Sequence, residues 1–195
     1  MNNQMREKLL EMRALDERVR EELAKTGELF DGYCPKMEVV HLENAAALEK
    51  MIAENGGWLG KSVVGKDGVD AAWLIVQHAI SLPGFSRRCL ESIENSVAEN
   101  EAAAQHAAML RDRIKFFEGK PQRYGTQSDW NKDGVMEVWT LENEGKVNDF
   151  RAAVGLEPLE NLTWETEETR ENAPPNYAER QRDFKDWAEK VGWRK

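Results

Sequence analysis

The chain has 195 residues, of which 41% are hydrophobic and 32% charged, and its formal net charge is -9. This length and composition predict one domain, or one domain with appendages, that buries a core and keeps a solvated surface. An acidic chain lacks the cationic surface that nucleic acids and anionic membranes attract, so we expect it to bind neither. No apolar run approaches the ~20 residues that span a bilayer.

Two features favour a cytoplasmic location. Residues 1–8 lack the apolar stretch of a secretion signal. The two cysteines, Cys34 and Cys89, fit a reducing compartment better than a disulfide framework, which needs several paired cysteines. We therefore expect a cytoplasmic protein.

The N-terminal segment predicts a long amphipathic helix with one polar residue on its apolar side. Residues 3–26 carry apolar side chains at spacings of three and four, and Gly27 is placed to end the helix. Asp16 occupies a position of this stripe that should be apolar, and Arg20 lies one turn later. We expect a partly buried Asp16–Arg20 pair rather than a solvent-exposed one.

The middle of the chain predicts further helices with short breaks between them. They follow a packed connector at 28–41 and cover residues 43–54, 69–81, 85–98 and 99–117. The first two turns of the helix at 69–81 are apolar on nearly every side, so we expect it to be the least exposed element. The short breaks favour antiparallel neighbours.

Residues 122–140 predict one β-hairpin. Its strands, 122–127 and 135–140, flank Asn131-Lys132-Asp133-Gly134, which is the residue chemistry of a tight turn. The turn also mimics the first half of a calcium-binding loop. Thr140, however, stands where that motif requires a glutamate, so we interpret the segment as a plain turn.

The C-terminal part predicts a short helix at 147–154, an acidic linker at 163–175 and an amphipathic helix at 176–191. Aromatic side chains lie on one face of the last helix, and we expect this face to dock on its own domain rather than on a partner chain. The predicted fold is therefore mainly α: a compact bundle of about six helices with one small β-hairpin at 122–140. The predicted domain covers 1–162, and the C-terminal helix is an appendage over 176–195.

Polar side chains gather on the strongest apolar segments, between residues 71 and 127. His78 lies near the end of its apolar helix, Arg113 flanks the stripe of a later helix, and a Gln-Arg-Tyr-Gly-Thr-Gln segment follows. A polar group costs about 1–3 kcal/mol if it is buried without a partner, so these groups satisfy one another or contact a ligand. The candidate ligand-binding residues are Arg113, Gln122, Tyr124 and Gln127, with His78 as a candidate general acid or base.

Other kinds of site are disfavoured by spacing. Gly60-Lys61-Ser62 lacks the glycine and the preceding strand that a phosphate-binding loop requires. Cys89 falls on the apolar stripe of its predicted helix, which disfavours a role as a catalytic nucleophile. No serine lies in a nucleophile-elbow pattern. The three histidines are His41, His78 and His106. They are scattered, and none has a second ligand three or four residues away, so we expect no metal and no cofactor.

The chain resembles an uncharacterised bacterial family, a domain of unknown function. The segments that carry the resemblance are Ala-Trp-Leu-Ile-Val-Gln-His-Ala at 72–79, Leu-Arg-Asp-Arg-Ile at 110–114 and Gly-Lys-Pro-Gln-Arg-Tyr-Gly-Thr-Gln at 119–127. It extends to His41-Leu-Glu-Asn44 and to an N-terminal Asp…Arg pair, and covers roughly residues 10–162. The resemblance implies no activity; it implies that one module contains His78, Arg113, Gln122, Tyr124 and Gln127. It adds four residues to the candidate ligand-binding set: Asp16, Arg20, His41 and Asn44.

Two functions remain open at this point. The first is a small-molecule enzyme or binding domain, in which Arg113 holds an anionic group and His78 transfers a proton. The second is a non-catalytic interaction or structural module, because buried His, Arg, Tyr and Gln networks often only fix a fold. The expected partner is a small anionic ligand, and the sequence does not indicate an oligomeric state.

Overall fold

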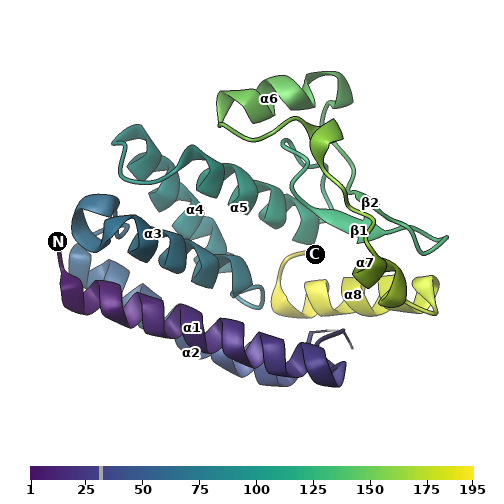
Figure 1. Ribbon diagram of the computed structural model, residues 1–195, viewed down its shortest axis with the longest axis horizontal. Helices are drawn as coiled ribbons and strands as arrows, with labels where there is room; N and C mark the ends of the chain where they lie inside the picture. The colour runs from purple at the N-terminus through teal and green to yellow at the C-terminus, as the bar shows by residue number, and fades with distance from the viewer. Residues whose placement is uncertain (31–32) are drawn as a thin grey trace. The chain divides into compact units, whose positions relative to one another are not determined.

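The computed structural model describes residues 1–30 and 33–195, and it is 67% helical, which confirms the mainly α fold class. Residues 31 and 32, within the expected connector, lie outside the described residues. The helices are α1 Asn3–Thr26, α2 Pro35–Asn55, α3 Lys61–His78, α4 Pro83–Ala98, α5 Ala104–Phe117, α6 Val147–Ala153, α7 Glu167–Glu171 and α8 Tyr177–Val191 (Figure 1). Three short 3-10 helices cover Glu28–Phe30, Glu144–Lys146 and Leu159–Asn161.

The chain divides into two compact units, Met1–His106 (unit 1) and Ala107–Lys195 (unit 2). Within unit 1, α1 lies along α2 and α3 (Figure 1). The expected domain over 1–162, with a linker and an appended helix after it, stays a prediction. None of the helices over residues 1–30 and 33–195 is long and apolar enough to cross a bilayer.

The core of unit 1 forms where the apolar stripes of its helices meet. Leu9 of α1, Leu48 of α2 and Ile75 of α3 are almost completely buried. Gly27 ends α1 in the left-handed conformation, as predicted. The second helix begins at Pro35, eight residues before the predicted start, because proline at the first helical position has a backbone angle that already suits a helix.

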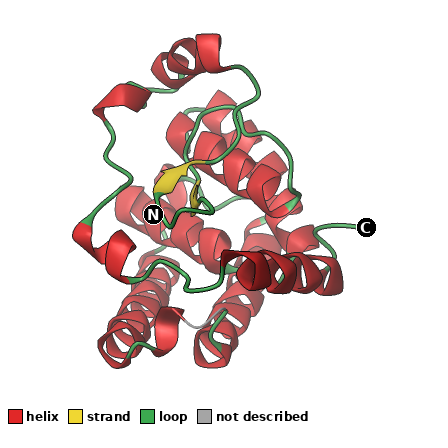
Figure 2. Ribbon diagram, turned by 90° about the vertical axis from the view of Figure 1, so that its right-hand side faces the viewer, coloured by secondary structure: helices red, strands yellow, loops and turns green. Residues whose placement is uncertain are grey.

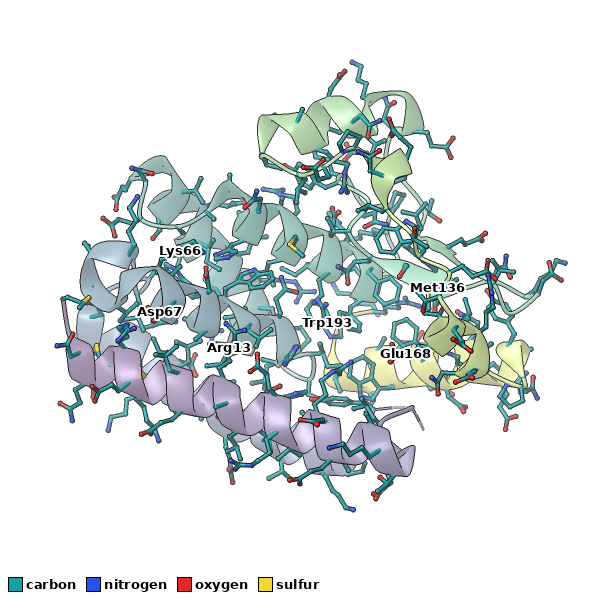
Figure 3. All side chains as sticks on the ribbon, in the orientation of Figure 1. Arg13, Lys66, Asp67, Met136, Glu168 and Trp193 are labelled. Carbon is teal, nitrogen blue, oxygen red and sulfur yellow. The ribbon has the colours of Figure 1, made fainter. Side chains whose placement is uncertain are left out.

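The apolar helix α3 buries most of residues 68–77, and its bounds differ from the predicted 69–81. It begins at Lys61 and is interrupted at Gly65, whose φ of 71° is a conformation that glycine adopts without strain. Asp67, just after the break and labelled in Figure 3, accepts a hydrogen bond of 2.8 Å from Nε of Arg6 on α1. The helix ends at His78, which therefore stands at the C-terminus of α3.

The predicted helix at 99–117 begins only at Ala104. Asn100 has a φ of 57°, and the N–H groups of Glu101 and Ala102 donate to the carbonyl oxygen of Ser96. Residues 99–103 are therefore a turn that satisfies the carbonyl groups at the end of α4, instead of the first turn of a new helix.

The β-hairpin is present but shorter than predicted (Figure 2). Strands β1 Ser128–Trp130 and β2 Met136–Val138 pair antiparallel, with Trp130 opposite Met136. The strand predicted at 122–127 is wrong: the backbone N–H groups of Arg123, Tyr124 and Thr126 donate to the buried carboxylate of Asp112 and are not available for a ladder. Oδ1 of Asn131 accepts the N–H groups of Asp133 and Val135, which builds the turn.

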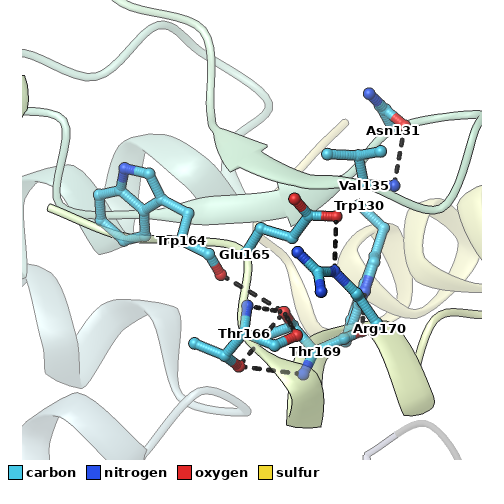
Figure 4. Close-up of polar contacts among 8 residues, drawn as sticks. All are labelled: Trp130, Asn131, Val135, Trp164, Glu165, Thr166, Thr169 and Arg170. Carbon is cyan, nitrogen blue, oxygen red and sulfur yellow. Dashed lines mark hydrogen bonds and ion pairs between the residues drawn. The ribbon is translucent and has the colours of Figure 1, made fainter.

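The segment expected as a linker contains the short helix α7. Thr166 caps it, since its hydroxyl accepts the N–H of Thr169 at 3.2 Å, and the indole of Trp130 donates to the carbonyl oxygen of Thr169 at 2.8 Å (Figure 4). The C-terminal helix α8 docks on its own chain, as expected: Phe184 contacts both Phe116 and Phe117 of α5.

Candidate functional site

Asp16, His41 and His78 meet within unit 1, and we call these three residues the Asp16 cluster. They come from three helices, α1, α2 and α3. Oδ1 of Asp16 lies 2.9 Å from Nδ1 of His78, and Oδ2 lies 3.2 Å from Nε2 of His41. The two imidazole rings are 5.1 Å apart between centroids. A single carboxylate therefore faces two histidine nitrogens, one with each of its oxygens.

The helices bring these residues together because each lies on the apolar side of its own helix. Asp16 shares the buried stripe of α1 with Leu9, Met12 and Leu23. His41 lies one turn after Met37 on α2. Packing the stripes against one another thus places the polar residues in contact.

Burial within the Asp16 cluster is graded. The side chain of Asp16 is 2% exposed, that of His41 is 8% exposed and that of His78 is 20% exposed. A charged carboxylate that is this deeply buried needs partners, and the two histidines supply them. The gradient makes His78 the member of the cluster that faces solvent.

The electrostatics of Asp16 follow from its two partners. Burial alone raises the pKa of Asp16, but the close polar contacts and the charge of His41 and His78 together outweigh burial and hold the pKa far below its usual range. Asp16 is therefore an anion at any physiological pH, and its negative charge fixes the two histidines around it.

Tyr33 supports the cluster from behind His41. The phenol oxygen lies 2.8 Å from Nδ1 of His41, and the two rings stack with centroids 5.8 Å apart. Burial raises the pKa of the Tyr33 phenol, and the negative charges of Glu38 and Asp16 raise it further, so the hydroxyl keeps its proton. Both nitrogens of His41 thus face a defined polar group.

A second buried carboxylate, Asp112 of α5, organises unit 2. It accepts the backbone N–H groups of Arg123, Tyr124 and Thr126 at 2.9–3.1 Å, together with the Thr126 hydroxyl at 3.0 Å. We call residues 122–127 the Asp112 loop. Its own backbone supplies the donors, so the carboxylate holds the loop in one conformation.

Two further side chains complete the Asp112 loop. Gln122 is fully buried; its amide nitrogen donates to the carbonyl oxygens of Gln127 and Trp139, and its oxygen accepts the N–H of Gln127. The guanidinium of Arg151 on α6 donates to the carbonyl oxygen of Tyr124. Burial lowers the pKa of Arg151, and the charge of Asp112 partly offsets this.

Comparison with known proteins identifies a family and no activity. The model of a family of unknown function, DUF6624, matches residues 3–170. The chain belongs to this family. No curated protein and no solved structure matches the chain. The expected resemblance to a domain of unknown function is therefore confirmed, and the family match includes both buried carboxylates.

The family match thus spans candidate residues that the structure distributes over both units. His78, His41 and Asp16 form one cluster in unit 1, whereas Gln122 and Gln127 hold the Asp112 loop in unit 2. Tyr124 and Arg113 are half-buried in unit 2. The single pocket expected for His78, Arg113, Gln122, Tyr124 and Gln127 stays a prediction.

Arg20 and Asn44 lie outside the Asp16 cluster. Arg20 is exposed, and Asp16 pairs with histidines rather than with the Arg20 side chain that the sequence predicted. Asn44 is buried and donates from its amide to the carbonyl oxygen of Met12 at 3.2 Å. Asn44 and Met12 also line a groove of about 510 Å³ between α1 and α2.

Sequence reasoning missed Tyr33 and Asp112 as members of these networks. Tyr33 is adjacent to Cys34 in a segment that gave no sign of a polar contact, and its partner is eight residues away. Asp112 did have a signal, because it lies beside the apolar positions Leu110 and Ile114 of a predicted helix.

Proposed function

We propose that this protein is a small-molecule enzyme or binding domain whose centre is the Asp16 cluster, and that its ligand is anionic. The observation that supports this proposal is the arrangement of one buried carboxylate between two histidines from separate helices. Such perturbed, titratable groups gather at functional sites more than elsewhere.

His78 is the residue that we assign to contact with the ligand. It is the most exposed member of the cluster, and Asp16 fixes its ring through Nδ1. A histidine whose ring is oriented by a carboxylate is suited to proton transfer at its second nitrogen, which is the role of a general acid or base. His41 and Tyr33 keep Asp16 in place.

A thermal-shift screen of carboxylate and phosphate metabolites tests the proposal. We expect at least one compound to raise the melting temperature of the wild-type protein, and we expect His78→Gln and Asp16→Asn to lose that response while remaining folded. His106→Gln is the matched control, because His106 is also buried and also lies near an aspartate, with Nε2 3.4 Å from Oδ1 of Asp70. If no compound binds, and His78→Gln only lowers stability, the proposal fails.

The second candidate is a non-catalytic module whose polar residues only stabilise the fold. The Asp112 loop favours this function for unit 2, since the side-chain amide of Gln122 bonds to backbone groups within residues 122–139. A ligand screen that gives no response in the wild type, together with a loss of stability in Gln122→Ala, would support it.

We also propose a bacterial protein that resides in the cytoplasm and binds neither nucleic acid nor membrane. The net charge of -9 supports the absence of both partners, because each attracts cationic surfaces. The free, buried state of Cys34 and Cys89 supports a reducing compartment. Fractionation of cells that express the protein tests the location.

A further inference from the structure

We propose that Asp16, His41 and His78 bind a divalent transition-metal ion. This inference rests on the proposed function, because both place the site at the Asp16 cluster. It adds the cofactor that the cluster would hold. The ion would supply a fixed positive charge that holds an anionic ligand beside the negatively charged Asp16.

The spacing of the ligand atoms fits such an ion. One nitrogen of each histidine and one carboxylate oxygen of Asp16 all lie within 4.8 Å of one another. Oδ1 of Asp16 is 2.9 Å from Nδ1 of His78, and Oδ2 is 3.2 Å from Nε2 of His41. In a tetrahedral site, ligand atoms bound to Zn²⁺ at about 2.0–2.2 Å lie about 3.3–3.6 Å from one another, so modest movements of the side chains would close the site around an ion.

His41 provides an independent sign of a ligand. Its side chain is 92% buried, and its Nε2, although 3.2 Å from Asp16, makes no well-aligned hydrogen bond. A buried polar nitrogen in this state costs free energy unless something binds it. An ion placed between Nε2 and the carboxylate would satisfy this nitrogen.

Tyr33 gives His41 the surroundings of a metal ligand. The nitrogen of His41 that points away from Asp16, Nδ1, lies 2.8 Å from the Tyr33 oxygen. Metal-bound histidines regularly hydrogen-bond through their second nitrogen, which fixes the ring orientation and the position of the proton. An ion on Nε2 would leave the proton on Nδ1, where the phenol oxygen accepts it.

The donor set selects the class of ion. Two imidazoles and one carboxylate suit Zn²⁺, Fe²⁺ or Co²⁺, whereas Mg²⁺ and Ca²⁺ prefer oxygen ligands alone. Three protein ligands leave at least one coordination position for another molecule. The charge of a divalent ion also exceeds the single negative charge of Asp16, so an anionic oxygen of a ligand would balance the remaining charge and fill the open coordination position.

Titration with Co²⁺ and Zn²⁺ tests the proposal on the full-length chain, purified without a metal-affinity tag and treated with a chelator. Visible absorption follows Co²⁺, and competition calorimetry follows Zn²⁺. We expect one equivalent to bind. Each of Asp16→Asn, His41→Gln and His78→Gln should lower the affinity about 100-fold or more, and Tyr33→Phe about 10-fold. The control His106→Gln should leave the affinity unchanged.

Circular dichroism establishes that each variant folds. If a variant does not fold, X-ray absorption at the zinc edge of the wild-type complex provides the second measurement, with two imidazoles and one carboxylate expected around the ion. The proposal is overturned if no ion binds in the micromolar range or tighter. It is also overturned if folded Asp16→Asn and His78→Gln bind as the wild type does.

The same samples separate this inference from the proposed function. A metabolite that binds equally well to chelator-treated protein, and still depends on His78, would refute the metal site and leave the proposed function standing. Stoichiometric Zn²⁺ binding that requires Asp16, with no metabolite bound in the presence of Zn²⁺, would refute the small-molecule function and leave the metal site.

Discussion

Two aspartates, Asp16 in unit 1 and Asp112 in unit 2, are equally buried and differ in their partners. Asp16 faces imidazole nitrogens from two other helices, whereas Asp112 faces three backbone N–H groups and a hydroxyl from one loop. The pKa changes also differ in direction. The pKa of Asp16 is lowered, whereas burial raises the pKa of Asp112 and its hydrogen bonds only partly offset that change.

This difference shows that burial alone does not identify a functional carboxylate. Backbone N–H groups do not titrate and do not bind metals, so the partners of Asp112 serve to fix the loop. Imidazoles exchange protons and bind ions near neutral pH, so the partners of Asp16 allow chemistry. The comparison predicts that changes at Asp112 alter stability and that changes at Asp16 alter ligand binding.

The largest effect is expected for Asp112→Ala. The substitution leaves three loop N–H groups without their acceptor, and we expect a loss of about 3–5 kcal/mol in the free energy of unfolding, measured with urea. Asp133→Ala, in the exposed hairpin turn, is the control and should stay within about 0.5 kcal/mol of the wild type. A loss below about 1 kcal/mol in Asp112→Ala would contradict the structural role.

Truncation at Pro174 should come next in size. It removes α8, whose Phe184 packs on two phenylalanines of α5, and burial of such a side chain is worth about 1.5–3 kcal/mol. We expect calorimetry to show a lower melting temperature. We expect light scattering to show the same mass in solution as for the full-length chain. Conversion of a dimer to a monomer at equal stability would instead make α8 an assembly element.

Acid unfolding sharpens the comparison through the sign of the two pKa changes. Because the pKa of Asp16 is lower in the folded state, its contribution to stability is present above about pH 4 and is lost as the pH falls further. We expect Asp16→Asn to remove roughly 1–3 kcal/mol of this acid-dependent stability, measured by urea unfolding from pH 6 to pH 2. Asp112, with its raised pKa, should contribute the opposite slope, and equal slopes for the two residues would refute the contrast.

The smallest effect on stability is expected for Tyr33→Phe. It removes one hydrogen bond to His41 and keeps the ring stacking, so the loss should be about 0.5–1.5 kcal/mol in urea unfolding. Tyr177→Phe, at the start of α8, serves as a control for the loss of a phenol elsewhere. A loss above about 3 kcal/mol would mean that the Asp16 cluster does not keep its structure without the Tyr33 hydroxyl.

The sequence predicted the helices well because apolar periodicity reports directly on which face is buried. The stripe of α1 located Asp16 as an anomaly, and the apolar run before His78 placed that histidine at the end of a buried helix. Helix starts were less accurate, at Pro35 and Ala104, because local caps and turns set them. The strand at 122–127 failed because a carboxylate elsewhere in the chain takes its N–H groups.

The partners within the Asp16 cluster were beyond sequence reasoning. His78 is 62 residues from Asp16, and spacing rules detect only ligands three or four residues apart on one helix. Scattered histidines therefore argued against a metal, although helix packing brings two of them to one carboxylate. The family resemblance pointed to His41 as a candidate residue, but it did not indicate which residue His41 contacts.

The most direct test of the central claim, that Asp16 joins His41 and His78 in one coupled cluster, is nitrogen NMR of the three histidine rings. For the metal-free protein, we predict a slowly exchanging proton on Nδ1 of His78, shifted downfield by Asp16, and a shift of both His41 and His78 in Asp16→Asn while His106 stays unchanged. Rings of His41 and His78 that are unaffected by Asp16→Asn would contradict the account.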